Sequence, residues 1–218
     1  MNKIRITGGE WRSRLVQVID VPDPAIRRAA SRMAATNMEP RQRRTPVTSP
    51  QGEAGRGGLI RPTPDRVRET LFNWLGQDLT GWRCLDLFAG TGILGFECAS
   101  RGAASVTLVE RDATAFARLK ENAATFGAER LRPVRADALE FATAASQQGE
   151  CYDLVLLDPP YRQGWLEKVA PLLPGLVRPG MWVYAEAEHR IETLGDWRTL
   201  KQGKAGQVFY HLLKNTNE

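Results

Sequence analysis

The tetrapeptide Asp158-Pro159-Pro160-Tyr161 follows the apolar run 154–157 and combines a carboxylate, two stiff prolines and an aromatic ring. Two prolines cannot continue a strand ladder or enter a helix interior, so they fix the direction of nearby carbonyls. Asp158 and the Pro159 carbonyl could then accept both hydrogens of a planar base amine, leaving the nitrogen lone pair aimed at a methyl donor. Tyr161 could stack on an extruded base. The pattern predicts these four as catalytic residues; an ordinary turn at the end of a strand is the alternative.

A second pattern, Asp86 to Gly95, lies where a predicted strand ends and a helix begins. Gly90, Gly92 and Gly95 satisfy the GxGxxG spacing, in which glycines admit a ligand close to the backbone and the helix N-terminus attracts a negative group. The spacing also suits a nicotinamide or flavin dinucleotide. A NAD-binding oxidoreductase and a non-catalytic nucleotide-binding module therefore stay open as alternatives.

Four acidic residues separate these alternatives. Asp86, Glu110 and Asp158 lie in the last residues of predicted strands, and Asp137 follows another. Ligands of an open parallel sheet bind beyond the carboxyl ends of its strands. Four carboxyl groups suit a cofactor that bears amines and a sulfonium, whereas they would repel a pyrophosphate. Glu110 could accept hydrogen bonds from ribose hydroxyls or be merely solvated, and Asp137 could instead cap the helix that starts at Ala138.

The elements that would position these residues alternate along the chain. Helices are predicted at 93–100 and 113–126, and a closing hairpin through 197–213. Strands are predicted at 84–88, 105–110, 131–135, 154–158 and 182–186. Such alternation implies a parallel sheet covered by helices on both faces. We therefore expect an α/β, Rossmann-like domain over residues 59–218.

The segment RPTPDRVRETLFNWL predicts a further helix. Thr63 is the candidate N-cap, and Pro64 suits the first helical position. Arg66 and Arg68 fall nearer the solvent side. The opposite, buried face follows the spacing i, i+3, i+4, i+7, i+8 and comprises Val67, Thr70, Leu71, Trp74 and Leu75.

Basic residues concentrate at the N-terminus. Residues 1–61 hold 12 Lys and Arg against 5 Asp and Glu, whereas the rest of the chain holds 18 against 20. Short strands at 3–6 and 14–21 predict a hairpin within residues 1–23. The charge asymmetry favours a polyanion such as nucleic acid as partner, with a solvated basic tail as the alternative.

Residues 24–58 have a different composition, rich in Ala, Arg, Ser, Pro and Gly and almost without large apolar side chains. Such a segment cannot bury enough surface to offset its ordering entropy, so we expect a flexible, low-complexity insertion. It could be a linker or could strengthen a nucleic-acid contact.

Metal and membrane sites are not expected. Cys84, Cys98 and Cys151 are isolated, and with only His189 and His211 beside them they make no zinc-site spacing. The N-terminus has no apolar core of a signal peptide, and the longest apolar stretch contains acidic residues. We expect a cytoplasmic protein.

Six segments together resemble the RsmD family of 16S ribosomal RNA guanine-N2 methyltransferases: IRITGGEWR, RPTPDRVRETLFNWL, CLDLFAGTGILGFEC, LVERD, DLVLLDPPY and AGQVFYHLL. The similarity spans nearly the whole chain, and its RPT and DPPY segments are more specific than the glycine loop. It implies methyl transfer from S-adenosylmethionine to the N2 amine of one guanine in 16S rRNA, on a partly or fully assembled small subunit. The insertion 24–58 departs from the family, whose members usually connect the hairpin to RPT directly.

The resemblance also assigns roles by motif position. Glu110 would contact the cofactor's ribose and Asp137 its adenine, and the DPPY loop would hold the target base. The residues that would line the rest of the cofactor are Asp86, Phe88, Gly90 and Gly92. The residues expected to hold RNA phosphates are Arg5, Arg12, Arg14, Arg66 and Arg68.

The substrate has an alternative, because DPPY fits any planar exocyclic amine. DNA adenine N6 or another RNA amine would serve the same chemistry, although no helix-turn-helix is evident for reading DNA. We expect the protein to act as a monomer.

Overall fold

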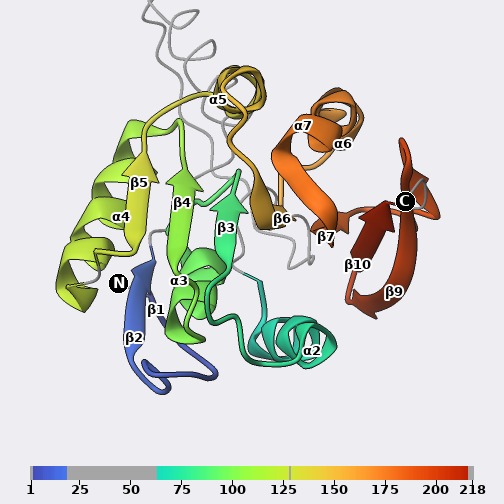
Figure 1. Cartoon of the computed structure of the whole chain (residues 1–218). Coiled ribbons are helices and arrows are strands. Elements are labelled where there is room, and N and C mark those ends of the chain that lie inside the picture. The colour runs from blue at the N-terminus through green and yellow to red at the C-terminus, as the bar shows by residue number, and fades with distance from the viewer. Residues whose placement is uncertain (1, 19–62, 128, 216–218) are drawn as a thin grey trace, which may run out of the picture. The chain divides into compact units, whose positions relative to one another are not determined.

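The computed structural model of the chain describes residues 2–18, 63–127 and 129–215 (Figure 1). The insertion predicted at 24–58 lies outside the described residues. The N-terminal hairpin and the remainder of the described chain form one compact unit.

A mixed sheet forms the centre of this unit, in the strand order β5-β4-β3-β6-β7-β10-β9-β8 (Figure 1). The strands β5, β4, β3, β6 and β7 run parallel to one another. The pairs β7–β10, β10–β9 and β9–β8 are antiparallel. The bounds are β3 Arg83–Asp86, β4 Ser105–Val109, β5 Leu131–Val134, β6 Tyr152–Leu157, β7 Val177–Ala187, β8 Thr193–Leu194, β9 Trp197–Ala205 and β10 Val208–Asn215. The predicted Rossmann-like α/β architecture is confirmed, as is the closing hairpin.

Helices cover both faces of the sheet, and alternate residues of each strand pack against opposite layers. Leu154 and Leu156 of β6 belong to the core shared with α2 (Asp65–Leu75), α3 (Ile93–Ser100) and α4 (Ala113–Phe126). Val155 and Leu157 belong to the core shared with α5 (Ala138–Gln147), α6 (Trp165–Val169) and α7 (Leu173–Leu176). A short 3-10 turn, Ala170–Leu172, joins α6 to α7. Burial on both faces explains the nearly continuous apolar run of this strand.

Strand β3 lies between β4 and β6, and the chain winds away from it in opposite directions on its two sides. Ligands of open α/β sheets bind in the crevice at such a switch point, beyond the carboxyl ends of the strands. The ends of β3 and β6 carry Asp86 and Asp158, so the fold brings the two sequence motifs together.

Helix α2 differs from its prediction at both its start and its buried face. Pro64 occupies the N-cap position without a side-chain cap, and Thr63 uses its hydroxyl elsewhere. The fully buried residues are Val67, Arg68, Leu71 and Phe72, whereas Thr70, Trp74 and Leu75 are only partly buried. The helix is rotated relative to the predicted stripe because Arg68 pairs with a buried acid of α3.

The N-terminal hairpin pairs β1 (Asn2–Arg5) with β2 (Leu15–Val18) in antiparallel register, as predicted. Ile6, Trp11 and Val16 are buried in the same core as α3 and α4. Gly9 has a φ of 76°, and a Cβ there would lie 1.9 Å from the carbonyl oxygen of Ser100. Only glycine permits this approach, which locks the hairpin against the end of α3.

Candidate active site

Three carboxylic residues end adjacent strands on the same face of the sheet. Asp86 is the last residue of β3, Asp158 directly follows β6, and Glu186 lies at the end of β7. Leu157 is paired with Ala185, so Asp158 and Glu186 are neighbours on adjacent strands. Because side chains alternate across a strand, both point to the face of α2 and α3. We refer to Asp86, Asp158 and Glu186 as the carboxylate row.

Asp86 is 2% exposed, and its surroundings disfavour a negative charge. Burial raises its pKa to about 7, against the effects of the Gly95 amide, which donates to Oδ2, and of the Phe88 amide. The charges of Glu110 and Glu186 raise it further. Its second oxygen, Oδ1, is buried without a hydrogen-bond partner among the described residues. A buried acceptor of this kind is ready for a donor or a cation.

The glycine turn connects β3 to α3 and leaves space above it. Gly90 and Gly92 have φ values of 55° and 91°, which residues other than glycine rarely adopt. A Cβ at Gly92 would lie 2.5 Å from Leu119 and Phe96, whereas nothing described lies within 4 Å of one at Gly90. Gly92 is therefore required for packing, and Gly90 faces open space where a ligand can approach.

Glu110 supports this turn from the end of β4. Its Oε2 accepts a hydrogen bond from the Gly90 amide at 2.9 Å, and its Oε1 accepts one from the Asp112 amide at 2.6 Å. Burial raises the pKa of Glu110. Each carboxylate oxygen keeps a further lone pair, so a diol could be bound here while the turn stays anchored.

Asp137 is the N-cap of helix α5, because its Oδ1 accepts a hydrogen bond from the Leu139 amide at 2.9 Å. Helix capping was the alternative to cofactor binding that the sequence left open for this residue. Its other oxygen lies 3.6 Å from Arg111 Nη1. Phe88, after the end of β3, packs edge-on against Trp165 with ring centroids 5.6 Å apart. Asp137 and Phe88 thus lie in the segments that follow the carboxyl ends of β5 and β3.

Pro159, Pro160 and Tyr161, which directly follow Asp158, border a hollow of about 340 Å³. Pro159 is buried, and Tyr161 is 39% exposed. The walls include Pro159, Pro160, Tyr161, Trp165, Glu186 and Glu188. Arg162, Gln163 and His189 also line it, so the hollow combines aromatic rings with both acidic and basic polar groups, a composition that can hold a flat polar molecule.

Asp158 and Glu186 share one hydroxyl. Thr63 Oγ1 lies 2.9 Å from Glu186 Oε1 and 3.5 Å from Asp158 Oδ2, and the Tyr184 hydroxyl donates to Glu186 Oε1 at 2.8 Å. Burial, then the charges of Glu186 and Asp86, raise the pKa of Asp158 well above its ordinary value. Glu186 receives the stronger hydrogen bonds, so Asp158 is the first of the pair to take up a proton.

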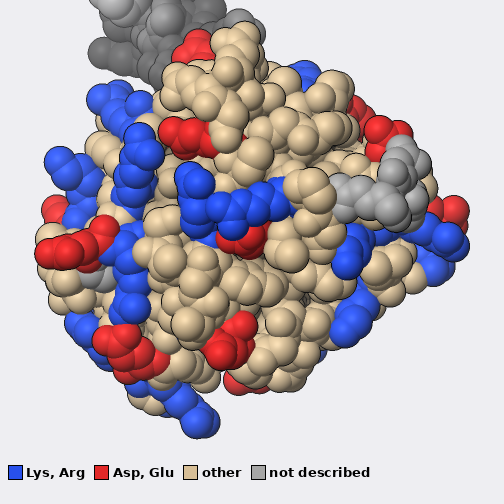
Figure 2. All heavy atoms as spheres, in the orientation of Figure 1, with Lys and Arg blue, Asp and Glu red and all other residues tan. Residues whose placement is uncertain are grey.

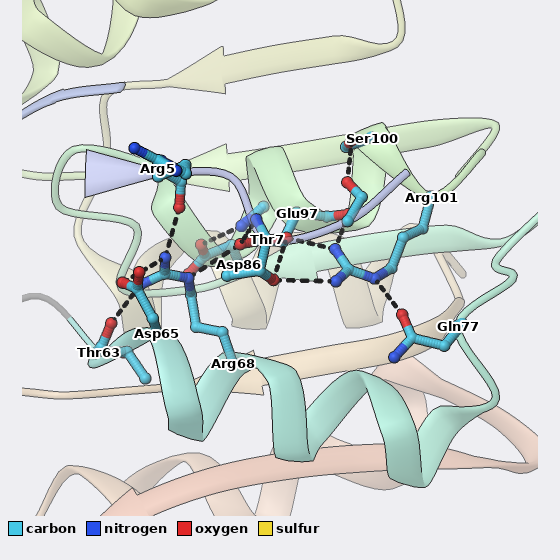
Figure 3. Close-up of polar contacts among 12 residues, drawn as sticks. Arg5, Thr7, Thr63, Asp65, Arg68, Gln77, Asp86, Glu97, Ser100 and Arg101 are labelled. Carbon is cyan, nitrogen blue, oxygen red and sulfur yellow. Dashed lines mark hydrogen bonds and ion pairs between the residues drawn. The ribbon is translucent and has the colours of Figure 1, made fainter. Parts of the chain in front are cut away.

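A second buried polar group, which we call the arginine network, consists of Arg68, Glu97 and Arg101 (Figure 3). Arg68 Nε lies 3.0 Å from Glu97 Oε1, and Arg101 pairs with Oε2 of the same residue. The Thr7 amide donates to Glu97 Oε1 at 2.8 Å. Arg68 also donates to the carbonyls of Thr63 and Arg5, so the network ties the hairpin, α2 and α3 together.

The expectation that Arg68 contacts RNA phosphates is wrong for this structure. Its side chain is fully buried, and its guanidinium group is engaged by Glu97, by Asp65 and by backbone carbonyls. The helical spacing indicated an outward side chain, but a buried acid on the neighbouring helix pulls it inward.

The other predicted RNA-binding arginines are exposed: Arg5, Arg12, Arg14 and Arg66. Arg14 also donates to the Thr125 carbonyl at 3.0 Å and lies over the Phe126 ring. Figure 2 shows basic side chains gathered on the side of α4 and again over β9 and β10. Exposed positive charge is thus spread over several elements.

Among the described residues, no group of three or more His, Cys, Asp or Glu side chains could hold a metal ion. Within the same ranges no helix has the length and apolar character required to cross a bilayer.

Three residues of the site were missed from the sequence. Glu186 belonged to a predicted strand but carried no motif, Thr63 was expected to be an N-cap, and Trp165 was not considered. The signal for Glu186 was an acid at the end of an otherwise apolar strand, the same signal that identified Asp86 and Asp158.

The family model described as Conserved hypothetical protein 95 matches residues 53–214. The chain belongs to this family. Ribosomal RNA small subunit methyltransferase D of Escherichia coli strain K12 is 35% identical over 215 residues, which cover 96% of this chain and 89% of the relative. The protein of the same name from Haemophilus influenzae is 37% identical over 181 residues, which cover 80% of this chain and 90% of the relative. The resemblance to the RsmD family is thereby confirmed.

A solved structure of a relative agrees with this membership, and a more distant structure shares the fold. The Escherichia coli protein yhhF is 32% identical, with a TM-score of 0.73 and complete coverage of both chains. An RNA methyltransferase from Salinibacter ruber in complex with S-adenosyl-L-homocysteine is 20% identical, with a TM-score of 0.58. The aligned region covers 72% of this chain and 95% of the Salinibacter chain. This more distant structural neighbour shares the fold.

Proposed function

We propose that this protein transfers a methyl group from S-adenosylmethionine to the exocyclic N2 amine of a guanine in 16S rRNA. The observation that carries the proposal is the position of Asp158. Its carboxyl group ends β6 beside the glycine turn, belongs to the carboxylate row and starts the loop that borders the hollow. Family membership and the names of the curated relatives support methylation of ribosomal RNA.

The residues at the switch point fit this cofactor. The buried Asp86 Oδ1 lacks a partner that an ammonium group would supply, and the space beside Gly90 admits a ligand. S-adenosylmethionine supplies an electrophilic methyl group on a positively charged sulfur. A row of carboxylates suits that positive charge and repels the pyrophosphate of a dinucleotide, which argues against a NAD-dependent reaction.

Asp158 has two tasks in the reaction. Its carboxylate and the Pro159 carbonyl accept the hydrogens of the base amine and hold the nitrogen lone pair toward the methyl group. As the new nitrogen–carbon bond forms and the sulfur–carbon bond breaks, positive charge develops on the nitrogen and the carboxylate stabilises it. The amine then loses one proton, which Asp158 takes up and passes to solvent.

The environment of Asp158 suits this task. Because burial and neighbouring acids raise its pKa, its ionised form is a stronger base than an exposed aspartate. A positively charged cofactor nearby favours that ionised form. Tyr161, at the mouth of the hollow, would stack on the base.

Contacts to the rest of the RNA are proposed for the exposed arginines Arg5, Arg12, Arg14 and Arg66. They would bind phosphates and position the RNA without reading its sequence. We propose that the partner is 16S rRNA within a partly or fully assembled small subunit, that the protein acts as a monomer, and that it works in the cytoplasm.

The test is the identity of the product. Small ribosomal subunits from cells that lack this protein are incubated with the protein and methyl-labelled S-adenosylmethionine, and the digested rRNA is analysed by mass spectrometry. We expect the label in N2-methylguanosine. Label in N6-methyladenosine, or none with 16S rRNA in any assembly state, would contradict the proposal.

A further inference from the structure

Glu186 is the member of the carboxylate row that the proposed reaction leaves without a task. It is 3% exposed, yet it lines the hollow beside the DPPY loop. It stands next to Asp158 on the adjacent strand, and one hydroxyl, that of Thr63, lies within 3.5 Å of both carboxyl groups. A buried carboxylate is costly unless its oxygens are hydrogen-bonded, so the partners of each oxygen indicate which of them is left for a ligand.

The hydrogen bonds of Glu186 fix one of its oxygens. The hydroxyls of Tyr184 and Thr63 both approach Oε1, at 2.8 and 2.9 Å. A carboxylate oxygen has two lone-pair sites, so these two donors occupy Oε1. They also lower the pKa of Glu186, against the effect of burial. The carboxylate is therefore held in a fixed orientation, and any contact with a base is left to Oε2.

Guanine presents two neighbouring donors on one edge, the ring N1–H and the N2 amine. Adenine presents an amine beside a ring nitrogen that is an acceptor. Two carboxylates on adjacent strand ends match the guanine edge, because one can accept from the amine and the other from the ring N–H. A fixed, desolvated carboxylate facing an adenine would meet the N1 lone pair and repel it.

We propose that Glu186 is the residue that selects guanine: it accepts the ring N1–H of the target base while Asp158 accepts from the amine. This inference rests on the proposed function, since it requires a base amine at Asp158. Glu188 lines the same hollow but is exposed and accepts from the Arg162 amide, so it discriminates less strongly than a buried group.

Thr63 follows from the same geometry as a positioning residue. Its hydroxyl holds Glu186, and its carbonyl accepts from Arg68. Thr63 thereby orients the base-reading carboxylate, in place of the helix-capping role expected from the sequence.

The decisive variant is Glu186→Gln, which keeps the shape and removes the charge. We expect methylation of guanine to fall roughly 10- to 100-fold, the effect of losing a hydrogen bond to a charged group. The new amide can donate to adenine N1, so the ratio of N6-methyladenosine to N2-methylguanosine should rise. Both products are measured by mass spectrometry, and the affinity for S-adenosylmethionine, measured by calorimetry, should stay within about threefold. Glu192→Gln, the same change on an exposed side chain, is the matched control.

Thr63→Val and Thr63→Ser keep the inference testable if Glu186→Gln folds poorly, which thermal melting would show. Thr63→Val leaves the charge of Glu186 and removes one of its donors, so we expect a smaller loss of guanine methylation. Thr63→Ser restores the hydroxyl and should recover most of it.

Three results would overturn the inference. If the unaltered protein forms N2-methylguanosine and folded Glu186→Gln forms it at the same rate and preference, Glu186 does not read guanine, although the proposed function stands. If Glu186→Gln is unfolded, equal guanine methylation by Thr63→Val and the unaltered protein would refute the arrangement. If the unaltered protein forms no N2-methylguanosine, the proposed function fails and the inference fails with it.

Discussion

The arginine network and the carboxylate row lie on the same face of one sheet and treat buried charge in opposite ways. In the network, Glu97 has a guanidinium group on each carboxylate oxygen. In the row, acids stand beside acids, and burial and mutual repulsion raise the pKa of Asp86 and Asp158. Compensated charge holds elements together, whereas uncompensated like charge is tolerated where a positively charged ligand can supply the missing partner.

The largest effect is expected from breaking the network. Glu97→Ala leaves two buried guanidinium groups without their shared acid, and we expect the free energy of unfolding to fall by about 3–5 kcal/mol. Urea denaturation measures this loss. Glu121→Ala removes the acid of a surface pair with Arg118, in which the Glu121 side chain is 64% exposed, and should cost less than about 1 kcal/mol. Equal losses in the two variants would remove the distinction between the network and ordinary surface pairs.

In the carboxylate row we expect a substitution to lower activity and to leave stability unchanged or increased. Asp158→Ala should raise the barrier to methyl transfer by about 2–4 kcal/mol, a roughly 30- to 1000-fold loss of kcat, because a preorganised acceptor is lost. The melting temperature should hold or rise, since one of three like charges is removed. Single-turnover methylation and thermal melting give the two readouts. Near-normal turnover with intact cofactor affinity would refute the role of Asp158.

The smallest effect concerns pH. The pKa of Asp86 is about 7 in the free protein, and an ammonium group bound beside it favours the ionised form, so binding releases a proton. Affinity for the cofactor should therefore fall as pH drops below about 7, by at most about tenfold per pH unit, and level off above it. Calorimetry across this range measures the slope.

Asp86→Asn is the control for this slope, and we expect it to flatten the dependence. S-adenosylhomocysteine keeps the ammonium group and lacks the sulfonium, so it should show the same slope. A dependence restricted to S-adenosylmethionine would point to Asp158 as the titrating group and contradict the assignment to Asp86.

The sequence allowed the sheet and much of the site to be predicted, because both follow from local patterns. Apolar runs that end in Asp86, Glu110 and Asp158 indicate buried strands whose carboxyl ends meet at one edge. For most strands the observed ends differ from the predicted ends by one or two residues. Strand β7 starts at Val177, five residues before its predicted start. None of these shifts affects the position of the motifs.

The remaining errors come from contacts between distant segments. Arg68 was assigned to solvent from helical spacing, which carries no information about Glu97 on another helix. Thr63 had the sequence signature of an N-cap, yet its hydroxyl meets an acid 123 positions further along the chain. The role of Glu186 could not be predicted because it depends on the pairing of β6 with β7, which places Glu186 beside Asp158.

The close approach of Gly9 to Ser100 has a consequence for attempts to divide the protein. The first eighteen residues supply the Thr7 amide to Glu97 and buried side chains to the central core. A truncated protein that starts at RPT would expose this apolar surface and lose part of the support for Arg68. The hairpin is therefore a poor candidate for removal or exchange, and chimaeras between relatives should keep it with its own α3.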